Sequence, residues 1–572
     1  MRLRSIAGRH RPLLIWGALL GMLGAAATLA QPLVIGELVG AASNGEPLTG
    51  LVALTAALFC ADAALAALEA YLVGRAGERI VYDIRRVLTG RLLGVDMAAF
   101  SRWDSADVLT RMVTDTSMAR IAVAQALAQV STSGLMVVGG LVLMAWIDGW
   151  LLSVTLGCLG VAAVASLLLG RRIRIAARRN RDDTSEFASG LQRVLGALTT
   201  VKASRAERRE EERVGALARE AERSGIRVTA YSAALPPTMN VGVQISLTVV
   251  VGWGATRVGS GTLSLADLTA FVTYLFYLVA PLVTLFMALG QLQQGRAAVD
   301  RLRELGALEQ EEAVAPRGDV PGAEVAGPAV EFDGVTFAYG SEPTLSDVSF
   351  TVPKRGLTAI VGPSGAGKTT LFQLVERFRV PGHGTVRLGS ADVAALPLAR
   401  VREVVGYVEQ DTPLVRGTIR ENLTYANPDA AADDIARALR LASLDGLVAS
   451  LPDGLDTELG ERGAGMSGGE RQRLAIARTL LQRPEVILLD EVTAHLDSET
   501  EATLRDALRE AARECAVLAI AHRMSTIVHA DRIIVMEEGR VRAIGTHQQL
   551  IASDEVYQRL AGRQFAAEGA PA

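Results

Sequence analysis

Six long stretches of apolar residues dominate the first half of the chain. They cover roughly residues 12–42, 51–73, 122–146, 150–170, 233–256 and 267–290. Each reaches the length of about 20 residues that a helix needs to cross the hydrocarbon core of a bilayer. The pattern therefore predicts an α-helical domain with six membrane-spanning helices, and the even number places both of its ends on one side of the membrane.

The segments between the spans differ in charge, and this difference predicts the orientation of the chain. The N-terminal tail holds four Arg, residues 75–120 hold eight, and residues 171–213 hold twelve Lys or Arg, whereas residues 43–50 and 147–149 hold none. Basic segments next to spans stay in the cytoplasm. We therefore expect a multi-pass membrane protein with both termini in the cytoplasm.

The first span could be mistaken for a secretory signal, because Arg residues precede it. Its apolar character resumes past Gln31 and Pro32, however, and continues to about Ala42. That length exceeds the core of a signal peptide. We therefore expect an uncleaved first helix. The basic segments Ile80–Leu93 and Phe187–Val201 keep a helical spacing of apolar residues, so long helices are expected to project into the cytosol.

The pattern changes after a polar stretch that is punctuated by Pro and Gly. This stretch, residues 305–328, predicts a linker between a membrane domain at 1–304 and a second domain at 329–572. In the second domain, short apolar strands such as Leu357–Val361 and Val517–Ile520 alternate with helices. Such alternation is typical of an α/β domain with a parallel sheet.

The composition agrees with an apolar part joined to a soluble part. Half of the residues are hydrophobic, yet 21% are charged. The net charge of -4 does not favour a nucleic-acid partner. The three Cys residues are widely spaced, so neither a disulfide framework nor a zinc site is indicated.

A phosphate-binding motif opens the second domain. Gly362–Thr369 matches G-x-x-x-x-G-K-[ST] and lies between the expected strand Leu357–Val361 and an expected helix at Thr370–Phe378. Its backbone N–H groups are expected to surround phosphate oxygens, while Lys368 reaches the terminal phosphates and Thr369 binds Mg²⁺. The expected nucleotide-binding residues here are Gly362, Pro363, Ser364, Gly365, Ala366, Gly367, Lys368, Thr369 and Thr370.

Two adjacent carboxylates follow another buried strand, Val486–Leu489. We expect Asp490 to bind the metal and Glu491 to take a proton from an attacking water. An acidic cap on the next helix is the alternative interpretation. His522, which ends the strand Val517–Ala521, is placed to hold the γ-phosphate or the water.

A second glycine-rich helix start precedes an expected helix at Arg473–Leu481. It contains Ser467, Gly468 and Gly469, and by itself it could be an ordinary N-cap. Together with the phosphate loop, the carboxylates and His522, it resembles the signature sequence of the ABC ATPases. The resemblance covers roughly residues 329–562.

This resemblance implies further roles. Tyr339 is similar to the aromatic residue that stacks on adenine, and Gln410 to the glutamine that contacts Mg²⁺ and water, so ATP and Mg²⁺ are the implied cofactors. Residues 457–463 resemble the exporter-specific stretch that touches the membrane domain. The chain departs from the family pattern at Glu470 and in the stretch after Glu491, where Ala494 and His495 lie at positions through which the two cassettes usually communicate. Active hydrolysis is still expected, while the effect of these residues on coupling stays open.

In the family that this chain resembles, the signature residues complete the nucleotide site of the opposite chain, and twelve helices form the transport pathway. The six spans here therefore imply a second half-transporter. A homodimer is expected, and a heterodimer stays open as an alternative. Membrane lipid and a small hydrophobic or amphipathic cargo are the other expected partners.

The first half resembles the membrane domain of ABC exporters, with Phe100–Asp107 and Ala203–Glu210 at the positions of the short coupling helices. The sequences at 370–378 and 417–423 resemble those of homodimeric bacterial multidrug exporters. This resemblance implies a place in the cytoplasmic (inner) membrane of a bacterium, with the ATPase domain in the cytoplasm. The resemblance implies ATP-driven export of a drug, a lipid or a secondary metabolite. Siderophore-type uptake, lipid flipping, half of a heterodimeric transporter, and an ATP-gated channel or receptor are the alternatives.

Ionisable and aromatic residues in the spans are candidates for cargo binding. Asp62, and less so Glu37 and Glu69, should face a cavity or a partner, because a charge in lipid is costly. Asp62 is a candidate for cation recognition or proton coupling, against a structural or solvated role. The sixth span carries aromatic residues that could bind amphipathic molecules, although packing in the core or against lipid is the preferred interpretation: Phe271, Tyr274, Phe276 and Tyr277.

Overall fold

The computed structural model describes residues 8–311, 327–410, 414–460, 465–491, 498–521 and 523–568. They divide into two compact units. One unit contains residues up to 90 together with 105–307, and the other contains 91–104 together with the described residues from 308 onward. The short segment 91–104 thus groups with the second unit, although it follows a long helix of the first.

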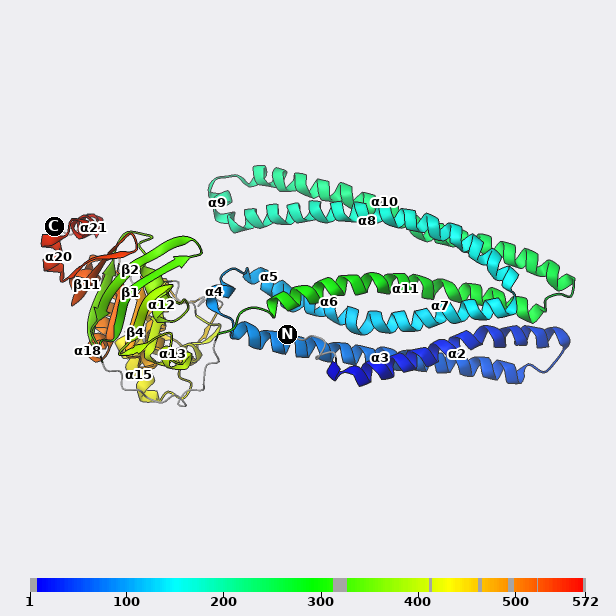
Figure 1. Cartoon of the computed structure of the whole chain (residues 1–572), viewed down its shortest axis with the longest axis horizontal. Helices are drawn as coiled ribbons and strands as arrows, with labels where there is room; N and C mark the ends of the chain where they lie inside the picture. The colour runs from blue at the N-terminus through cyan, green and yellow to red at the C-terminus, as the bar shows by residue number, and fades with distance from the viewer. Residues whose placement is uncertain are drawn as a thin grey trace. The chain divides into compact units, whose positions relative to one another are not determined.

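Six helical runs in the described part of the chain are long and apolar enough to cross a membrane (Figure 1). Each expected span lies within one of them, which confirms that prediction. The third run passes through α5 (Ser105–Thr110), η1 (Arg111–Asp115), α6 (Thr116–Arg120), η2 (Ile121–Ala126) and α7 (Leu127–Ile147). The others are α2 (Arg11–Asn44), α3 (Thr49–Leu93), α8 (Gly149–Gly196), α10 (Glu207–Gly259) and α11 (Leu265–Leu305).

Polar residues at the helix ends set the turns on the side of the membrane opposite the basic segments. The Asp148 carboxylate accepts hydrogen bonds from the backbone N–H groups of Trp150 and Leu151 at the start of α8, and it pairs with Arg257 of α10. Ser264 caps α11 in the same way. Since an N-cap side chain satisfies backbone donors that have no partner inside the helix, these residues determine where the helices begin.

The long helices pack in two groups that share contacts. α8 and α10 run along one another and are joined at one end by α9 (Leu198–Ala203), whereas α2, α7 and α11 pack together (Figure 1). Glycines allow close approach within the second group: a Cβ on Gly36 would lie 2.5 Å from the Ala266 carbonyl oxygen, and one on Gly295 would lie 1.9 Å from Ala122 Cβ. Small residues at such contacts are typical of helices packed in membranes.

The two short helices lie earlier in the chain than the sequence suggested. In place of Phe100–Asp107, the structure has α4 (Met97–Phe100), because the Asp96 carboxylate caps it by accepting from Ala99 N–H. In place of Ala203–Glu210, the structure has α9, and the next long helix already begins at Glu207. Both expected positions were therefore wrong by several residues.

The second unit is an α/β domain with two main sheets. The six-stranded sheet has the order β12-β11-β3-β10-β9-β6, and every neighbouring pair in it is parallel except β11 with β12. The four-stranded sheet has the order β2-β1-β4-β5 and is antiparallel. This arrangement confirms the expected fold class, six membrane helices followed by an α/β cassette.

The strands are β1 (Val330–Tyr339), β2 (Glu342–Val352), β3 (Gly356–Val361), β4 (His383–Leu388), β5 (Ala391–Asp392), β6 (Val405–Val408), β7 (Gly417–Thr418), β8 (Glu458–Leu459), β9 (Val486–Asp490), β10 (Ala516–Ile520), β11 (Arg532–Glu537) and β12 (Arg540–Gly545). The helices are α12 (Lys368–Val375), α13 (Leu398–Val404), α14 (Ile419–Leu423), α15 (Ala432–Leu441), α16 (Asp445–Ser450), α17 (Gly468–Leu481), α18 (Ser498–Glu514), α19 (Met524–Val528), α20 (His547–Ser553) and α21 (Glu555–Glu568).

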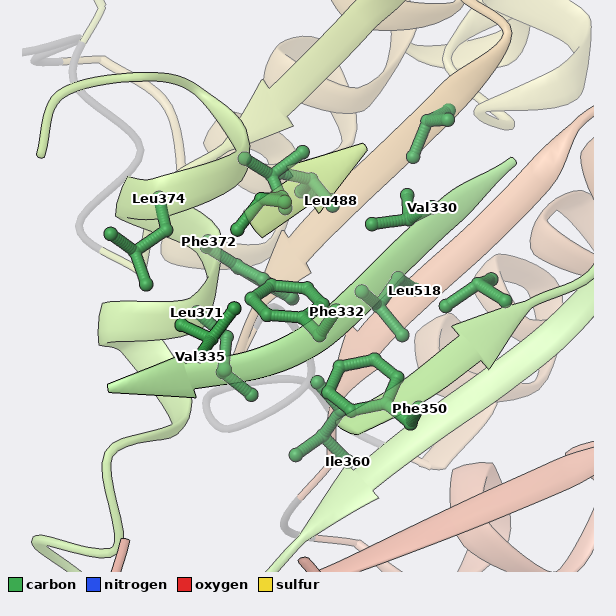
Figure 2. Packing of buried hydrophobic residues seen from close by; sticks show 14 of the residues in the cluster. Val330, Phe332, Val335, Phe350, Ile360, Leu371, Phe372, Leu374, Leu488 and Leu518 are labelled. Atoms are coloured by element: carbon green, nitrogen blue, oxygen red, sulfur yellow. The ribbon is translucent and has the colours of Figure 1, made fainter. Parts of the chain in front are cut away.

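The main core of this domain fills the space between its two sheets and α12. Figure 2 shows Phe332 and Phe350 of the antiparallel sheet close to one another, and their ring centroids are 4.6 Å apart. Phe372 of α12 and Leu488 of β9 belong to the same cluster. Burial of these side chains stabilises the domain by roughly 1.5–3 kcal/mol each. The core thus holds the start of α12 against the ends of the parallel strands.

Candidate active site

The phosphate loop connects β3 to α12, and its glycines are required by the space around it. A Cβ on Gly362 would lie 2.3 Å from the Met536 carbonyl oxygen, and one on Gly367 would lie 2.6 Å from Leu345 Cδ2. Gly365 and Gly367 also have positive φ angles of 82° and 90°, which glycine adopts without strain. The loop therefore brings backbone N–H groups to a helix N-terminus, where they can bind an anion.

Lys368, the first residue of α12, folds back over the loop. Its side chain is buried, and its Nζ donates to the carbonyl oxygens of Gly362 at 2.9 Å and Pro363 at 3.0 Å. Burial lowers the pKa of the Lys368 ammonium group, and the carboxylates of Glu491 and Asp490 oppose this change. The ammonium group thus lies between the loop and the two acidic residues.

Asp490 is the last residue of β9, at the edge where neighbouring parallel strands also end. Only 4% of it is exposed, and its Oδ1 atom has no hydrogen-bond partner among the described residues. Burial raises the pKa of Asp490, while a hydrogen bond with Thr369 and the charge of Lys368 oppose the rise. A carboxylate with a free buried oxygen beside a threonine hydroxyl suits Mg²⁺, which prefers oxygen ligands and keeps several positions for water and phosphate.

Glu491 and Gln410 meet at the same edge of the sheet. Gln410 follows the end of β6, and its Nε2 donates a hydrogen bond to Glu491 Oε2 at 2.9 Å. Glu491 has a φ angle of 50°, which is unfavourable for a residue with a side chain. Backbone strain of this kind is concentrated at functional sites.

Tyr339 ends β1, where the residue is 41% exposed. The hydroxyl donates to Gln373 Oε1 at 2.8 Å, and the Arg379 guanidinium carbon lies 5.3 Å from the ring centroid. Phe337 packs its ring edge-on at 5.0 Å. Polar and aromatic neighbours therefore fix the orientation of an accessible aromatic ring.

The second glycine-rich segment is the start of α17. Ser467 caps the helix: its hydroxyl accepts from Glu470 N–H, and the Glu470 carboxylate accepts from Ser467 N–H at 2.6 Å. This reciprocal pair is a capping box. Gly468 and Gly469 begin the helix immediately after the cap. The helix therefore starts five residues before the predicted Arg473, and Glu470 has a structural role that the sequence interpretation missed although its S-x-x-E spacing signals it.

Some predicted residues lie outside the described part of the chain. They are His522, Ala494, His495 and the second half of the exporter-like stretch, residues 461–463. Its first half is described: Glu458 of β8 pairs with Thr418 of β7. Among the predicted residues that are described, the structure brings together at the ends of the parallel strands Lys368, Thr369, Gln410, Asp490 and Glu491.

The membrane-domain candidates have separate surroundings. Phe271 and Tyr274 are buried in the helical core, and the Tyr274 hydroxyl donates to the Leu29 carbonyl oxygen at 2.5 Å, in agreement with the preferred core interpretation. Glu37 is exposed on α2. Asp62 and Glu69 on α3 are partly buried and accept hydrogen bonds from threonine hydroxyls.

A nucleotide-binding α/β domain with paired acidic residues, joined to six membrane-length helices, defines an ATP-hydrolysing transport protein of the membrane. Residues 14–282 match the ABC transporter transmembrane region, and residues 345–494 match the ABC transporter domain. The chain therefore belongs to the ABC transporter family, as a half-transporter of the exporter type in which hydrolysis of ATP is coupled to transport.

Similar proteins cover nearly the whole chain. A "Multidrug resistance ABC transporter ATP-binding and permease protein" of Lactococcus lactis is 32% identical over 96% of this chain and 93% of its own length. An "ATP-dependent lipid A-core flippase" of Dechloromonas aromatica is 33% identical over 89% of this chain and 87% of its own. A solved bacterial Atm1-family ABC exporter with ATP bound has a TM-score of 0.80 at 27% identity, covering 97% of this chain and 98% of that one.

Proposed function

We propose that two copies of this chain form a homodimer in the cytoplasmic membrane of a bacterium, with the ATPase domains in the cytoplasm, and export an amphipathic or lipophilic molecule. The observation that carries the proposal is the set of hydrolytic residues gathered at the ends of β6 and β9, next to the phosphate loop. The similarity to multidrug exporters over nearly the full chain supports the choice of cargo.

The residues of the site divide the work of hydrolysis. Lys368 and the loop 362–370 bind the phosphates, and Tyr339 stacks on the adenine. Thr369, Gln410 and Asp490 would hold Mg²⁺, which would supply positive charge to neutralise the phosphates. Glu491 accepts a proton from the attacking water, which Gln410 helps to orient. His522 holds the γ-phosphate or that water.

Two chains are needed to complete each site. Ser467, Gly468 and Gly469 present the capped start of α17, a helix N-terminus suited to the nucleotide phosphates of the opposite chain. ATP binding then closes the two cassettes, the short helices α4 and α9 transmit the closure to the membrane helices, and hydrolysis by Glu491 resets the transporter.

A lipid is the second candidate cargo, because several similar proteins are named lipid A-core flippases. None of the similar proteins quoted above is named for uptake, so export is preferred over an uptake system. The two cargo classes give different readouts. A soluble amphipathic molecule would accumulate inside inverted vesicles, whereas a flipped lipid would move from one leaflet of the bilayer to the other.

Inverted membrane vesicles test the proposal. We expect ATP-dependent accumulation of amphipathic probes in vesicles that hold the wild-type chain, and no accumulation with Glu491→Gln. Purified protein in nanodiscs should elute at the mass of a dimer and hydrolyse ATP continuously. A well-folded dimer without ATP turnover would contradict the assignment as a pump, and turnover without transport of any probe or lipid would contradict export.

A further inference from the structure

A cavity of about 540 Å³ opens between the helices of the membrane domain. Residues of α2, α3, α7 and α11 line it. Rings of Phe59, Phe276 and Tyr277 supply much of its apolar wall, and Asp62 and Glu69 supply two carboxylates. Its size suits a small organic molecule.

The two carboxylates lie on one face of α3. They are seven residues apart, so about two helical turns separate them along the cavity. Asp62 Oδ1 accepts a hydrogen bond from the Thr28 hydroxyl at 2.8 Å, and Glu69 Oε1 accepts one from the Thr132 hydroxyl at 3.1 Å. None of the cavity-lining residues is Lys, Arg or His, and neither carboxylate forms an ion pair within the described chain. The negative charge of this wall is thus left without a cation from the protein.

Glycines on α2 make room for these carboxylates. A Cβ on Gly21 would lie 2.4 Å from the Glu69 carboxyl carbon, and a Cβ on Gly24 would lie 3.6 Å from Asp62 Oδ1. The first distance is far below any real contact of a Cβ atom. The surface of α2 is therefore shaped around the Glu69 side chain, which would have to move if Gly21 carried a methyl group.

Gln31 supplies an independent indication of a ligand. Its side chain lines the cavity, although only 1% of the residue is exposed. Its Oε1 accepts a hydrogen bond from the Tyr277 hydroxyl at 3.1 Å, while its Nε2 has no partner among the described residues. Because an unpaired buried donor destabilises a protein, a ligand with a hydrogen-bond acceptor would complete this group.

We propose that this cavity binds an amphipathic organic cation, with its positive charge held by Asp62 and Glu69 and an acceptor atom held by Gln31. The aromatic rings that line the same cavity contact the apolar body and attract the positive charge as well. The inference rests on the proposed export function and names the substrate class for it. A charged wall in a membrane domain is tolerated because it faces this cavity and its ligand.

Binding to purified dimer in nanodiscs, without ATP, tests the inference separately from transport. The probe is berberine, a permanent aromatic cation with ether oxygens, and the neutral comparison is the acetoxymethyl ester of calcein. We expect Asp62→Asn with Glu69→Gln to weaken berberine binding at least tenfold and to change binding of the neutral probe by less than twofold. Glu37→Gln removes an exposed carboxylate of the same domain and should leave berberine binding unchanged.

Two further variants keep the test decisive if the double variant does not fold. Gly21→Ala leaves both charges in place but displaces the Glu69 carboxylate, so berberine binding should weaken. Gln31→Leu should weaken binding of berberine and leave that of tetraphenylphosphonium, a cation without an acceptor, unchanged. Equal losses for the charged and neutral probes, or an unchanged berberine affinity, would overturn the inference.

The same samples distinguish this inference from the proposed function. Wild-type vesicles that accumulate the neutral probe but neither bind nor transport berberine would overturn the cation site and leave export standing. Vesicles that transport no probe, with berberine still bound in a manner dependent on Asp62 and Glu69, would overturn export and leave the site standing.

Discussion

Gln410 and Glu491 are joined by a hydrogen bond of 2.9 Å between Gln410 Nε2 and Glu491 Oε2. The two residues follow different strands, β6 and β9, which are parallel neighbours in the sheet. The contact fixes the orientation of the proposed general base before any water is bound.

Replacing Glu491 should stop hydrolysis and preserve nucleotide binding. In Glu491→Gln the side chain keeps its size but loses the proton acceptor, so steady ATPase activity should fall by about 10²–10⁴-fold. Release of phosphate and the affinity for a fluorescent ATP analogue are the measurements. Glu485→Gln, on the surface near the start of β9, is the control. Hydrolysis in Glu491→Gln within threefold of the wild type would contradict the role as a general base.

Arg379 contacts both Ser101, the residue that follows α4, and Tyr339, the residue that we propose stacks on adenine. Its Nη2 donates to Ser101 Oγ at 3.1 Å, and its guanidinium lies over the Tyr339 ring. In Arg379→Gln we expect cargo to stimulate ATPase activity several-fold less than in the wild type, because the contact between these two elements is lost. Tyr339→Ala should instead raise the KM for ATP by about tenfold, since stacking contributes roughly 1 kcal/mol or more.

Cargo-stimulated and basal ATPase rates separate these two effects. Tyr339→Trp retains an aromatic face and should restore the KM. Ser101→Ala removes the acceptor of the Arg379 hydrogen bond, together with the bond that the same hydroxyl donates to the Ala98 carbonyl oxygen, and it should reproduce a part of the loss in stimulation. An Arg379→Gln variant with full stimulation by cargo would refute the coupling role of this contact.

Glu470 should be replaceable by Gln but not by Ala. Gln completes the capping box with Ser467 as well as Glu does, so Glu470→Gln should keep the wild-type ATPase rate. Glu470→Ala loses one of the two reciprocal hydrogen bonds, at a cost of about 1 kcal/mol at the start of α17, and ATPase activity should drop several-fold. We would compare the ATPase rates of the two variants and their amide hydrogen exchange at residues 468–471. Equal amide exchange in Glu470→Gln and Glu470→Ala would contradict the prediction.

Glu376 should make the stability of the cassette depend on pH. It is buried at the end of α12, and this burial raises its pKa to about 8, against the opposing charge of Arg402. Because the pKa of Glu376 is raised in the folded state, the full stability of the fold is present below the ordinary glutamate pKa of 4.5 and is lost as the pH rises toward about 8. Between these limits the folded wild type should lose about 4 kcal/mol relative to Glu376→Gln.

Calorimetric unfolding of the full-length chain at pH 5 and pH 8 measures this difference. The cassette transition of Glu376→Gln should shift less between the two pH values than that of the wild type. Glu342→Gln, at an exposed position, should follow the wild type. A parallel shift for all three proteins would show that Glu376 does not titrate in this range.

The sequence was most informative where one local pattern determines the structure. Helix length and hydropathy predicted the six spans, and the G-x-x-x-x-G-K-[ST] motif placed the phosphate loop between β3 and α12. An S-x-x-E spacing at Ser467 and Glu470 is a local signal of the same kind. Our prediction from the sequence nevertheless missed the capping box that these two residues form at the start of α17. Both short helices were misplaced because a four-residue helix such as α4 has no periodicity, and Asp96 decides its position through one hydrogen bond.

The cavity could not be predicted from the sequence, because it depends on how separate helices pack. Asp62 was recognisable as a costly charge within a span, but its partnership with Glu69 follows from the contact of α3 with α2 at Gly21 and Gly24. Which aromatic residues of α11 reach the cavity could not be predicted either, because this also depends on how the helices pack. Phe271 and Tyr274 face the core, while the neighbouring Phe276 and Tyr277 reach the cavity.

The helix α3 runs without interruption from Thr49 to Leu93, and its last residues already group with the second unit. It therefore carries Asp62 and Glu69 on the same stiff rod that leads into residues 91–104. From Glu69 to Leu93 the rod measures about 36 Å at 1.5 Å per residue. If a cation bound to the carboxylates turned this helix about its axis, the rotation would be carried along the helix to residues 91–93. Cargo binding and ATP hydrolysis would then be coupled through α3 itself.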